Sequence, residues 1–261
     1  MMEKIPLSVA VITKDEERNI AACLESVAFA GQVVVVDSGS TDATVAVARS
    51  LGAEVHEEAW RGGFGAQKQL AVDLCRRDWI LVLDADERVP PETAAAIAAA
   101  LGKADGEVAG FSFPRKNYFQ GRWIRHAGWW PDRLTRLFRR GRGRMSTAAV
   151  HEGVEVDGLV LPLAAPILHY TEGDLGKILA KIDRYSTLAA ETAFAEGRRA
   201  TVYEAFWRAF FTFIQDYFLR LGALDGGAGL TLAVTDSVNK FFKYAKLARL
   251  SAAGTGEGGL P

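Results

Sequence analysis

Cysteine is scarce in this sequence, and long hydrophobic runs are absent. Cys23 and Cys75 both lie in helical patterns and neither belongs to a CxxC motif, which excludes a disulfide scaffold and a cysteine-ligated zinc site. No uncharged apolar run reaches the ~18 residues that suggest a membrane span. The start, MMEKIPLSVAVITKDEE, lacks the apolar core and cleavage site of a signal peptide. We therefore expect a cytoplasmic protein, soluble or peripheral on a membrane.

The glycine-rich motifs of two common nucleotide-binding classes are also missing. The sequence contains no GxGxxG and no GxxxxGK[ST], which disfavours a dinucleotide Rossmann site and a P-loop. The glycines at 62–65 do not follow a strand and open a helix in the required register. They predict a loop before a helix, in which Lys68 either reaches a phosphate or is simply solvated.

Charge is unevenly distributed along the 261 residues, although the net charge is only −1. The net charge is −8 for 1–112, +5 for 113–172 and +2 for 173–261. An acidic half joined to a basic middle suggests two different ligands. Because the chain as a whole is not basic, we do not expect nucleic-acid binding.

Strand and helix patterns alternate over the first 112 residues. Apolar runs at 7–13, 32–38 and 79–86 predict strands buried on both faces, hence a parallel sheet. Helical patterns lie at 16–28, 42–51, 66–76 and 91–101. This alternation predicts a doubly wound α/β fold. Later strand-like runs lie at 108–114, 133–139, 150–156 and 165–170, and helices are predicted over 173–196, 201–221 and about 228–250.

Polar side chains follow each of the three N-terminal strands, at 13–16, 37–42 and 84–86. Ligands of an open parallel sheet bind at the carboxyl ends of its strands, so these segments should converge. Asp84 and Asp86 project to the same face of their strand. Two such carboxylates repel unless a cation holds them, and a divalent ion that also binds diphosphate is a natural solution. The alternative is a loop that merely caps the next helix.

The motifs SVAVITKDEERNI, VVVVDSGSTDAT, GFGAQKQLA and WILVLDADERV resemble the family 2 glycosyltransferases of the GT-A fold. The motifs RKNYFQGRWIRHAGWWPD, RLFRRG, VHEGV, LHY, RYSTLAA and FFKYAKL resemble the lipopolysaccharide-core β-1,4-glucosyltransferase branch. The resemblance covers about residues 7–250. It implies a nucleotide-sugar half at 1–112, an acceptor half at 113–172 and a C-terminal helical extension at 173–261.

The same resemblance implies roles for donor-site residues. Thr13 and Glu16 would line the nucleoside pocket, and Asp37 would accept a hydrogen bond from the uracil edge. Asp84 would lie near the ribose and diphosphate. Many relatives have an aromatic residue and Asn where this sequence has Lys and Asp at 14–15, so stacking on the base is not expected there.

The implied chemistry is inverting transfer of a sugar from a nucleotide diphosphate. Asp86 would hold Mg²⁺ or Mn²⁺, and His169 is either an additional metal ligand or an ordinary core histidine. Inversion needs one general base to deprotonate the acceptor hydroxyl, while the metal stabilises the leaving diphosphate. Glu152 matches the family position best, with Asp132 as the runner-up; the alternative for Glu152 is an exposed strand-edge glutamate. His151 would orient Glu152 or the acceptor.

Arginine is concentrated at 133–144, which holds six in twelve residues. Guanidinium groups recognise carboxylates and phosphates bidentately, which fits an acidic, lipid-linked oligosaccharide acceptor or anionic headgroups; some of these arginines simply solvate a loop. The candidate acceptor-binding residues are Arg115, Trp129, Arg133, Arg136 and His151.

The helical segment 201–221 is rich in aromatic residues and carries a narrow polar stripe with a four-residue period. The stripe consists of Glu204, Arg208, Thr212, Asp216 and Arg220. Such a helix is buried among helices, forms a homodimer contact or lies in a membrane interface. Its aromatic density favours the interface, on the cytoplasmic face of the inner membrane.

Together these features predict transfer of glucose from UDP-glucose to an inner-core heptose of lipopolysaccharide. A second possibility is a family 2 transferase that acts on polyprenyl phosphate or on a capsule or exopolysaccharide acceptor. A third, of another class, is a non-catalytic, membrane-associated nucleotide-sugar binder.

Overall fold

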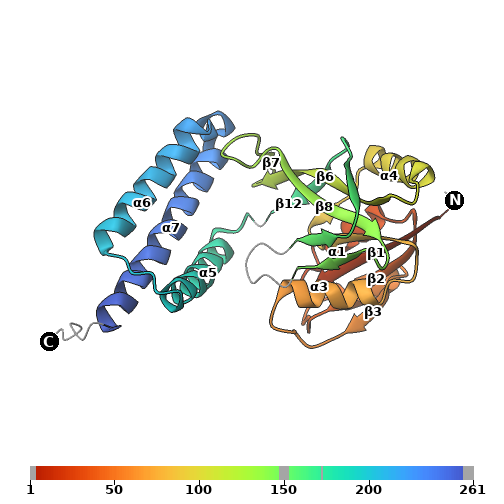
Figure 1. Ribbon diagram of the computed structural model, residues 1–261, viewed down its shortest axis with the longest axis horizontal. Helices are drawn as coiled ribbons and strands as arrows, with labels where there is room; N and C mark the ends of the chain where they lie inside the picture. The colour runs from red at the N-terminus through yellow and green to blue at the C-terminus, as the bar shows by residue number, and fades with distance from the viewer. Residues whose placement is uncertain (1–3, 147–152, 172, 255–261) are drawn as a thin grey trace. The chain divides into compact units, whose positions relative to one another are not determined.

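The computed structural model describes residues 4–146, 153–171 and 173–254 (Figure 1). The chain forms two compact units, which we describe separately. Unit 1 consists of 1–116 and 131–170, and unit 2 consists of 117–130 and 171–261. The sequence segment 113–172 is therefore shared, because residues 117–130 group with the C-terminal helices.

Unit 1 is built on a sheet whose first four strands are parallel, in the order β3-β2-β1-β4. Their bounds are Ile5–Thr13 for β1, Ala30–Asp37 for β2, Glu54–Glu57 for β3 and Trp79–Asp84 for β4. Beyond β4, β8 (Asp132–Arg139) is antiparallel to β4, and β6 (Val108–Phe119) is antiparallel to β8. This antiparallel side brings distant segments beside the end of β4.

Short strands complete unit 1. β5 (Glu87–Arg88) pairs with β12 (Ile167–Tyr170), β11 (Leu159–Pro162) pairs with β6, and β9 (Gly143–Met145) pairs with β10 (Val154–Val156). The pairing of β5 with β12 matters most, because it brings residues after β4 next to the late strand that carries His169.

Helices cover both faces of the parallel strands because their side chains alternate. In β1, Val9 and Val11 face one core and Ala10 and Ile12 face the other. The first core receives α1 (Ile20–Ser26), α2 (Thr44–Ser50) and α4 (Pro91–Lys103), and the second receives α3 (Phe64–Asp73). The predicted doubly wound α/β class is confirmed.

Differences from the predicted elements are local. Helix α1 begins at Ile20 rather than at residue 16, because the carbonyl of Glu16 accepts the N–H groups of Asn19 and Ile20 in a tight turn. Strand β3 was not predicted, because its four residues, EVHE, show no apolar run. It forms by adding to the edge of β2.

Unit 2 consists mainly of three helices: α5 (Leu175–Ala195), α6 (Val202–Ile214) and α7 (Gly226–Gly254). Helix α7 packs against both α5 and α6. A π-helical turn (Gln215–Leu219) and a 3₁₀ turn (Gly222–Asp225) connect α6 to α7. The short strand β7 (Arg122–Trp123) pairs with the end of β6, and Phe119 and Ile124 pack against the start of α7. Among the described residues, no helix is both long and apolar enough to cross a membrane.

Candidate functional site

The ends of β1, β2 and β4 meet at one edge of the sheet, as the sequence pattern predicts. Thr13, the last residue of β1, lies opposite Asp37, the last residue of β2. On the other side of β1, Ile12 lies opposite Asp84, which ends β4. The side chains that follow these strands are therefore neighbours, at the edge where parallel sheets bind ligands.

Asp84 is held by two cations that come from different parts of unit 1. The Nζ of Lys68, in α3, lies 2.6 Å from Oδ1 of Asp84, and the Nη2 of Arg136, in β8, lies 2.9 Å from Oδ2. Burial alone would raise the pKa of Asp84, but Lys68 and Arg136 hold this pKa well below its usual range. Asp84 therefore stays ionised, and its charge is neutralised within the protein.

Glu87 is a fully buried carboxylate that the sequence analysis did not single out. Its Oε1 lies 2.6 Å from Nη2 of Arg136 and 3.3 Å from Nη1 of Arg115. Its Oε2 accepts the backbone N–H of Asp84 at 3.0 Å. The signal was present, because Glu87 directly follows Asp-Ala-Asp in the sequence. Glu87 fixes the backbone that carries both aspartates.

Arg136 does not have the contacts expected of an acceptor-binding residue. Its side chain is only 8% exposed and its guanidinium binds Asp84 and Glu87. Burial alone would lower the pKa of Arg136, but these two carboxylates raise it above its ordinary value. We therefore reassign Arg136 from the acceptor side to the support of the donor-side carboxylates.

Asp86 and His169 form the second feature of this edge. The Nε2 of His169 lies 3.3 Å from Oδ2 of Asp86. The strand pairing explains the approach, because His169 of β12 lies opposite Glu87 of β5 and the N–H of Tyr170 donates to the carbonyl of Asp86 at 2.9 Å. The structure thus brings together the two residues that the sequence analysis named as metal ligands.

Within the described ranges, no group of three or more His, Cys, Asp or Glu side chains could hold a metal ion by itself. A carboxylate oxygen and an imidazole nitrogen nevertheless fit a divalent ion whose remaining ligands are water and diphosphate oxygens, since Mg²⁺ usually keeps waters and substrate phosphates among its ligands. The Asp86–His169 pair is therefore chemically suited to a shared protein–substrate metal site.

The nucleoside side of the edge contains an unusual buried hydroxyl. The Oγ1 of Thr13 is buried and finds no hydrogen-bond partner in the part of the chain that the structure describes. Nearby, the carboxylate of Asp37 accepts the N–H groups of Gly39 and Ser40 at 2.9 and 2.8 Å. Gly39 has φ +84°, a conformation that glycine adopts without strain. An unsatisfied buried hydroxyl is costly, and a bound polar ligand would remove that cost.

Two acidic residues after β1 tie the neighbouring loops together. Glu16 accepts the side-chain N–H of Asn19 at 2.8 Å, and its own N–H donates to Thr44 Oγ1 at 2.8 Å. Asp15 has φ +53°, and its Oδ1 accepts the N–H of Thr41 at 2.7 Å. The Asp15 contact links the loops after β1 and β2.

The other predicted residues have diverse placements. Arg115 pairs with Asp132 at 2.7 Å, and Arg133 donates to the carbonyls of Ser112 and Leu163, both at 3.0 Å. Trp129 belongs to unit 2, where it packs edge-on against Phe119 with ring centroids 6.3 Å apart. The predicted base Glu152 and its neighbour His151 lie outside the described residues.

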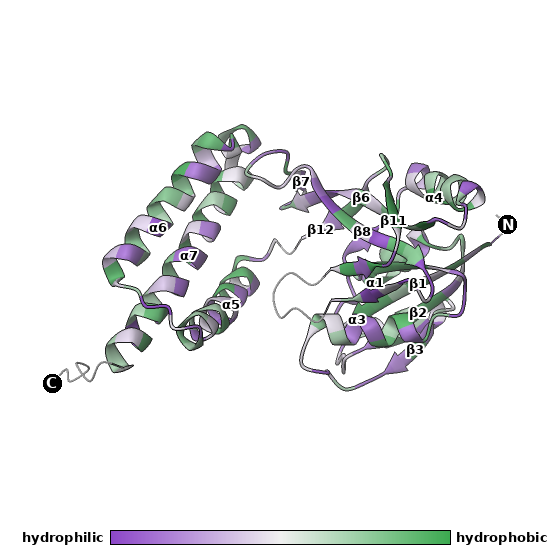
Figure 2. Cartoon of the chain, in the orientation of Figure 1, coloured by the Kyte–Doolittle hydropathy of each residue, from purple (hydrophilic) through white to green (hydrophobic). Residues whose placement is uncertain are grey.

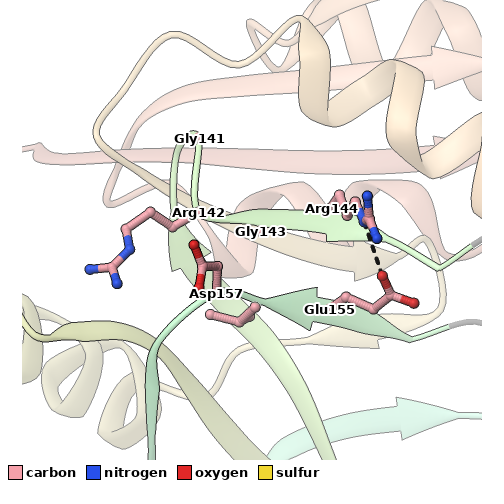
Figure 3. A pocket seen from close by; sticks show the side chains of 7 residues that line it. Gly141, Arg142, Gly143, Arg144, Glu155 and Asp157 are labelled. Atoms are coloured by element: carbon pink, nitrogen blue, oxygen red, sulfur yellow. Dashed lines mark hydrogen bonds and ion pairs between the residues drawn. The ribbon is translucent and has the colours of Figure 1, made fainter.

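A hollow of about 330 Å³ lies at the paired strands β9 and β10, which form a sheet separate from the one that carries Asp84 (Figure 3). It is lined by residues 141–144 and 155–157. Three of its charged groups are already engaged: Arg144 pairs with Glu155 at 2.9 Å, and Arg142 donates to the carbonyl of Gly106 at 2.9 Å. We therefore place the candidate site at the strand ends and not in this hollow.

Comparison with known proteins gives matches over most of the chain. Residues 8–154 match the model of Glycosyl transferase family 2. The chain is 32% identical to the lipopolysaccharide core biosynthesis glycosyltransferase LpsC of Rhizobium meliloti (strain 1021), over 95% of this chain and 93% of that protein. It is 29% identical to an uncharacterized glycosyltransferase of Rickettsia felis, over 94% of this chain and 90% of that protein.

Solved structures give weaker similarity. The structure of S. aureus TarS 1–349 in complex with UDP has a TM-score of 0.48 and 17% identity, over 97% of this chain and 92% of that chain. Glucosyl-3-phosphoglycerate synthase from Mycobacterium tuberculosis, in complex with Mn²⁺, UDP and glucosyl-3-phosphoglycerate, has a TM-score of 0.34 and 24% identity, over 44% of each chain.

We predict that Arg136→Met destabilises unit 1 by about 3–5 kcal/mol, because it leaves Glu87 and Asp84 without their shared buried cation. Arg140→Met is the matched control: Arg140 is an exposed arginine four residues further along, and its replacement should change stability by less than about 0.5 kcal/mol. Urea unfolding followed by circular dichroism measures both. Equal free energies of unfolding for the two variants would show that the buried ion pairs of Arg136 do not stabilise the fold.

Proposed function

Because the chain belongs to glycosyl transferase family 2, we propose that it transfers glucose from UDP-glucose to an inner-core heptose of lipopolysaccharide, with inversion at the anomeric carbon. The observation that carries the reaction class is the convergence of Asp84, Asp86 and His169 at the carboxyl ends of the parallel strands. The similarity to LpsC over 95% of the chain supports the lipopolysaccharide core as the source of the acceptor.

We propose that the donor lies along the edge of the sheet from β2 to β4. Thr13 offers to the nucleoside, beside Glu16, a hydroxyl that has no partner among the residues the structure describes. Asp37 accepts the N–H groups of Gly39 and Ser40 on Oδ2 and the hydroxyl of Ser40 on Oδ1, but a carboxylate has about four acceptor positions and can take a further hydrogen bond from a uracil N–H. Asp84, with its charge offset by Lys68, borders the ribose and diphosphate without repelling them.

In this proposal Asp86 and His169 hold Mg²⁺ or Mn²⁺. The ion supplies positive charge that stabilises the departing nucleotide diphosphate. The pairing of β5 with β12 keeps these two ligands close together. The nearby carboxylates of Asp84 and Glu87 form ion pairs with Lys68 and Arg136. Asp86 would be the negatively charged ligand of this ion and His169 the neutral nitrogen ligand beside it.

The general base in the proposal is Glu152, on the strength of the family resemblance of VHEG. Its carboxylate would take the proton from the acceptor hydroxyl as that oxygen attacks the anomeric carbon. The runner-up, Asp132, already accepts the guanidinium of Arg115 at 2.7 Å, a contact that holds β6 beside β8. We therefore assign Asp132 a structural part and Glu152 the proton transfer.

A panel of donors and acceptors tests the function directly. We expect a product larger by one hexose, detected by mass spectrometry, when the protein is given UDP-glucose and a heptose-containing core oligosaccharide. UDP-galactose and UDP-N-acetylglucosamine serve as donor controls, and an acceptor without heptose as the acceptor control. Transfer only to polyprenyl phosphate or to a capsule sugar would contradict the proposed heptose acceptor. Binding of UDP-glucose with no turnover on any acceptor would contradict the proposal that the protein is an enzyme.

Asp86→Asn should lower kcat/KM by at least about 100-fold, since even indirect supports of metal sites cost 10–100-fold when mutated. The variant keeps the shape of the side chain, so the circular dichroism spectrum should not change. Asp78→Asn, at an exposed aspartate that precedes β4, is the control and should keep full activity. If Asp86→Asn turned over substrate at the wild-type rate, the Asp86 carboxylate would have no part in the reaction.

Glu152→Gln should lower kcat by about 10²-fold or more, because a lost general base costs 10²–10⁴-fold, while the affinity for UDP stays unchanged. Asp132→Asn should keep the larger part of kcat. Single-turnover measurements, together with UDP titrations, separate loss of chemistry from loss of binding. The assignment would be reversed if Asp132→Asn were inactive and Glu152→Gln active.

A further inference from the structure

Helix α6 carries an uncovered row of aromatic side chains, which we call the aromatic face. It consists of Tyr203, Phe206, Trp207, Phe210 and Phe211, which are 82, 55, 53, 44 and 62% exposed. Their spacing of three and four residues places them on one side of the helix. Rings of Phe206, Trp207, Phe210 and Phe211 contact one another at centroid distances of 5.3–6.4 Å, so the face is continuous.

The opposite side of α6 is the side that packs within unit 2. Ala205 and Ala209 are buried, and the carbonyl of Ala209 accepts the hydroxyl of Ser237 in α7 at 2.8 Å. The helix therefore turns its small residues toward α7 and leaves its large aromatic residues exposed. An ordinary amphipathic helix does the reverse, so the aromatic face needs a partner. In Figure 2, hydrophobic and hydrophilic residues alternate along the ribbon of α6.

The apolar surface continues past the end of α6. Phe218, Leu219, Leu221 and Leu224, in the connection between α6 and α7, are 54, 75, 51 and 60% exposed. These leucines lie on short turns rather than on a regular helix. Large apolar side chains at the end of a helix and on the turn that follows it can enter a lipid interface without any matching partner surface.

The charges around the aromatic face favour an anionic partner. The two carboxylates of α6 and its π-helical turn are paired internally: Glu204 with Arg208 at 2.7 Å and Asp216 with Arg220 at 2.9 Å. In α7 the acidic residue is Asp236, and Lys240, Lys243, Lys246 and Arg249 follow it; Lys246 pairs with Asp183 of α5 at 2.7 Å, so the other three cations are the ones that this pairing leaves available. Unit 2 thus combines apolar rings with cations and places no unpaired carboxylate on α6.

We propose that the aromatic face docks on a lipid bilayer with anionic headgroups. Trp207 and Tyr203 have polar tips on apolar rings, the combination that settles at the headgroup level. Nearby lysines and arginines add electrostatic attraction that salt weakens. A docked unit 2 holds the enzyme at the surface where a lipid-linked acceptor is found. The biological reason for docking rests on the proposed function, whereas the structural evidence for docking comes from unit 2 alone.

Co-sedimentation of the full chain with vesicles tests the docking. We expect binding to vesicles of phosphatidylglycerol and phosphatidylcholine, weaker binding at high salt, and little binding to phosphatidylcholine alone. The double variant Trp207→Glu/Phe211→Glu should bind at least about tenfold more weakly. Leu51→Glu is the matched control, because Leu51 is an apolar residue of unit 1 that is 43% exposed; it should bind like the wild type. If the glutamate variant does not fold, Trp207→Gln/Phe211→Gln replaces it.

Three outcomes would overturn the proposal. The first is wild-type protein that stays in the supernatant with anionic vesicles at low salt. The second is equal binding by the wild type and the double variant. The third is a wild-type dimer in light scattering that the double variant converts to monomer without any vesicle binding, which would make a second copy of the chain the partner.

A soluble assay separates this proposal from the proposed function. Release of UDP from UDP-glucose, with a core oligosaccharide freed of its lipid as acceptor, should be the same for the double variant and the wild type. Vesicle binding without turnover by the wild type would contradict the proposed function alone. Turnover without vesicle binding would contradict the docking alone.

Discussion

The buried guanidinium of Arg136 is the interaction on which the candidate site depends. Residues 84–87 contain three carboxylates, and three ionised groups so close together would repel strongly in a buried setting. Arg136 joins two of them, Asp84 and Glu87, from a neighbouring antiparallel strand. Lys68 and Arg115 complete the neutralisation. The strand end can therefore carry Asp86 toward His169 without an excess of uncompensated charge.

The carboxylates of residues 84–87 have two different kinds of partner: protein cations for Asp84 and Glu87, and the imidazole of His169 for Asp86. Asp84 and Glu87 pair with protein cations, so their charges are balanced without a metal ion, and Glu87 also binds the backbone N–H of Asp84. Asp86 contacts an imidazole, a group that can share a divalent ion with it. In the proposed function, a nucleotide diphosphate, which brings negative charge of its own, would bind where the protein's charge is already balanced and an added cation is favoured. The proposed chemistry follows from that balance.

The sequence predicts the parallel part of the fold well because its signals are local. Each strand of the β2-β1-β4 core is a continuous apolar run, and the polar residues after it fall at a known edge of the sheet. Asp86 and His169, named as ligands from sequence, are indeed neighbours. The support of the site was harder to predict, because it depends on β8 pairing with β4 across more than fifty residues. An arginine run does not reveal which guanidinium turns inward, so the sequence alone groups Arg136 with the acceptor-binding residues.

Helix α6 shows the same limit of periodicity. The sequence pattern distinguishes its apolar side from its polar stripe, but not which side the neighbouring helix covers. Ala205 and Ala209, two small residues, decide this by allowing close approach to α7. The periodicity of the sequence also does not predict the positive φ angles of Gly39 and Asp15, because these conformations depend on contacts between the loops after β1 and β2.

Titration of UDP into the protein by calorimetry, once with Mn²⁺ and once with EDTA, tests the central claim most directly. If Asp86 and His169 share an ion with the diphosphate, Mn²⁺ should tighten UDP binding by about tenfold or more, and UDP should tighten Mn²⁺ binding by the same factor because the coupling is reciprocal. Equal affinity for UDP in Mn²⁺ and in EDTA would contradict the account.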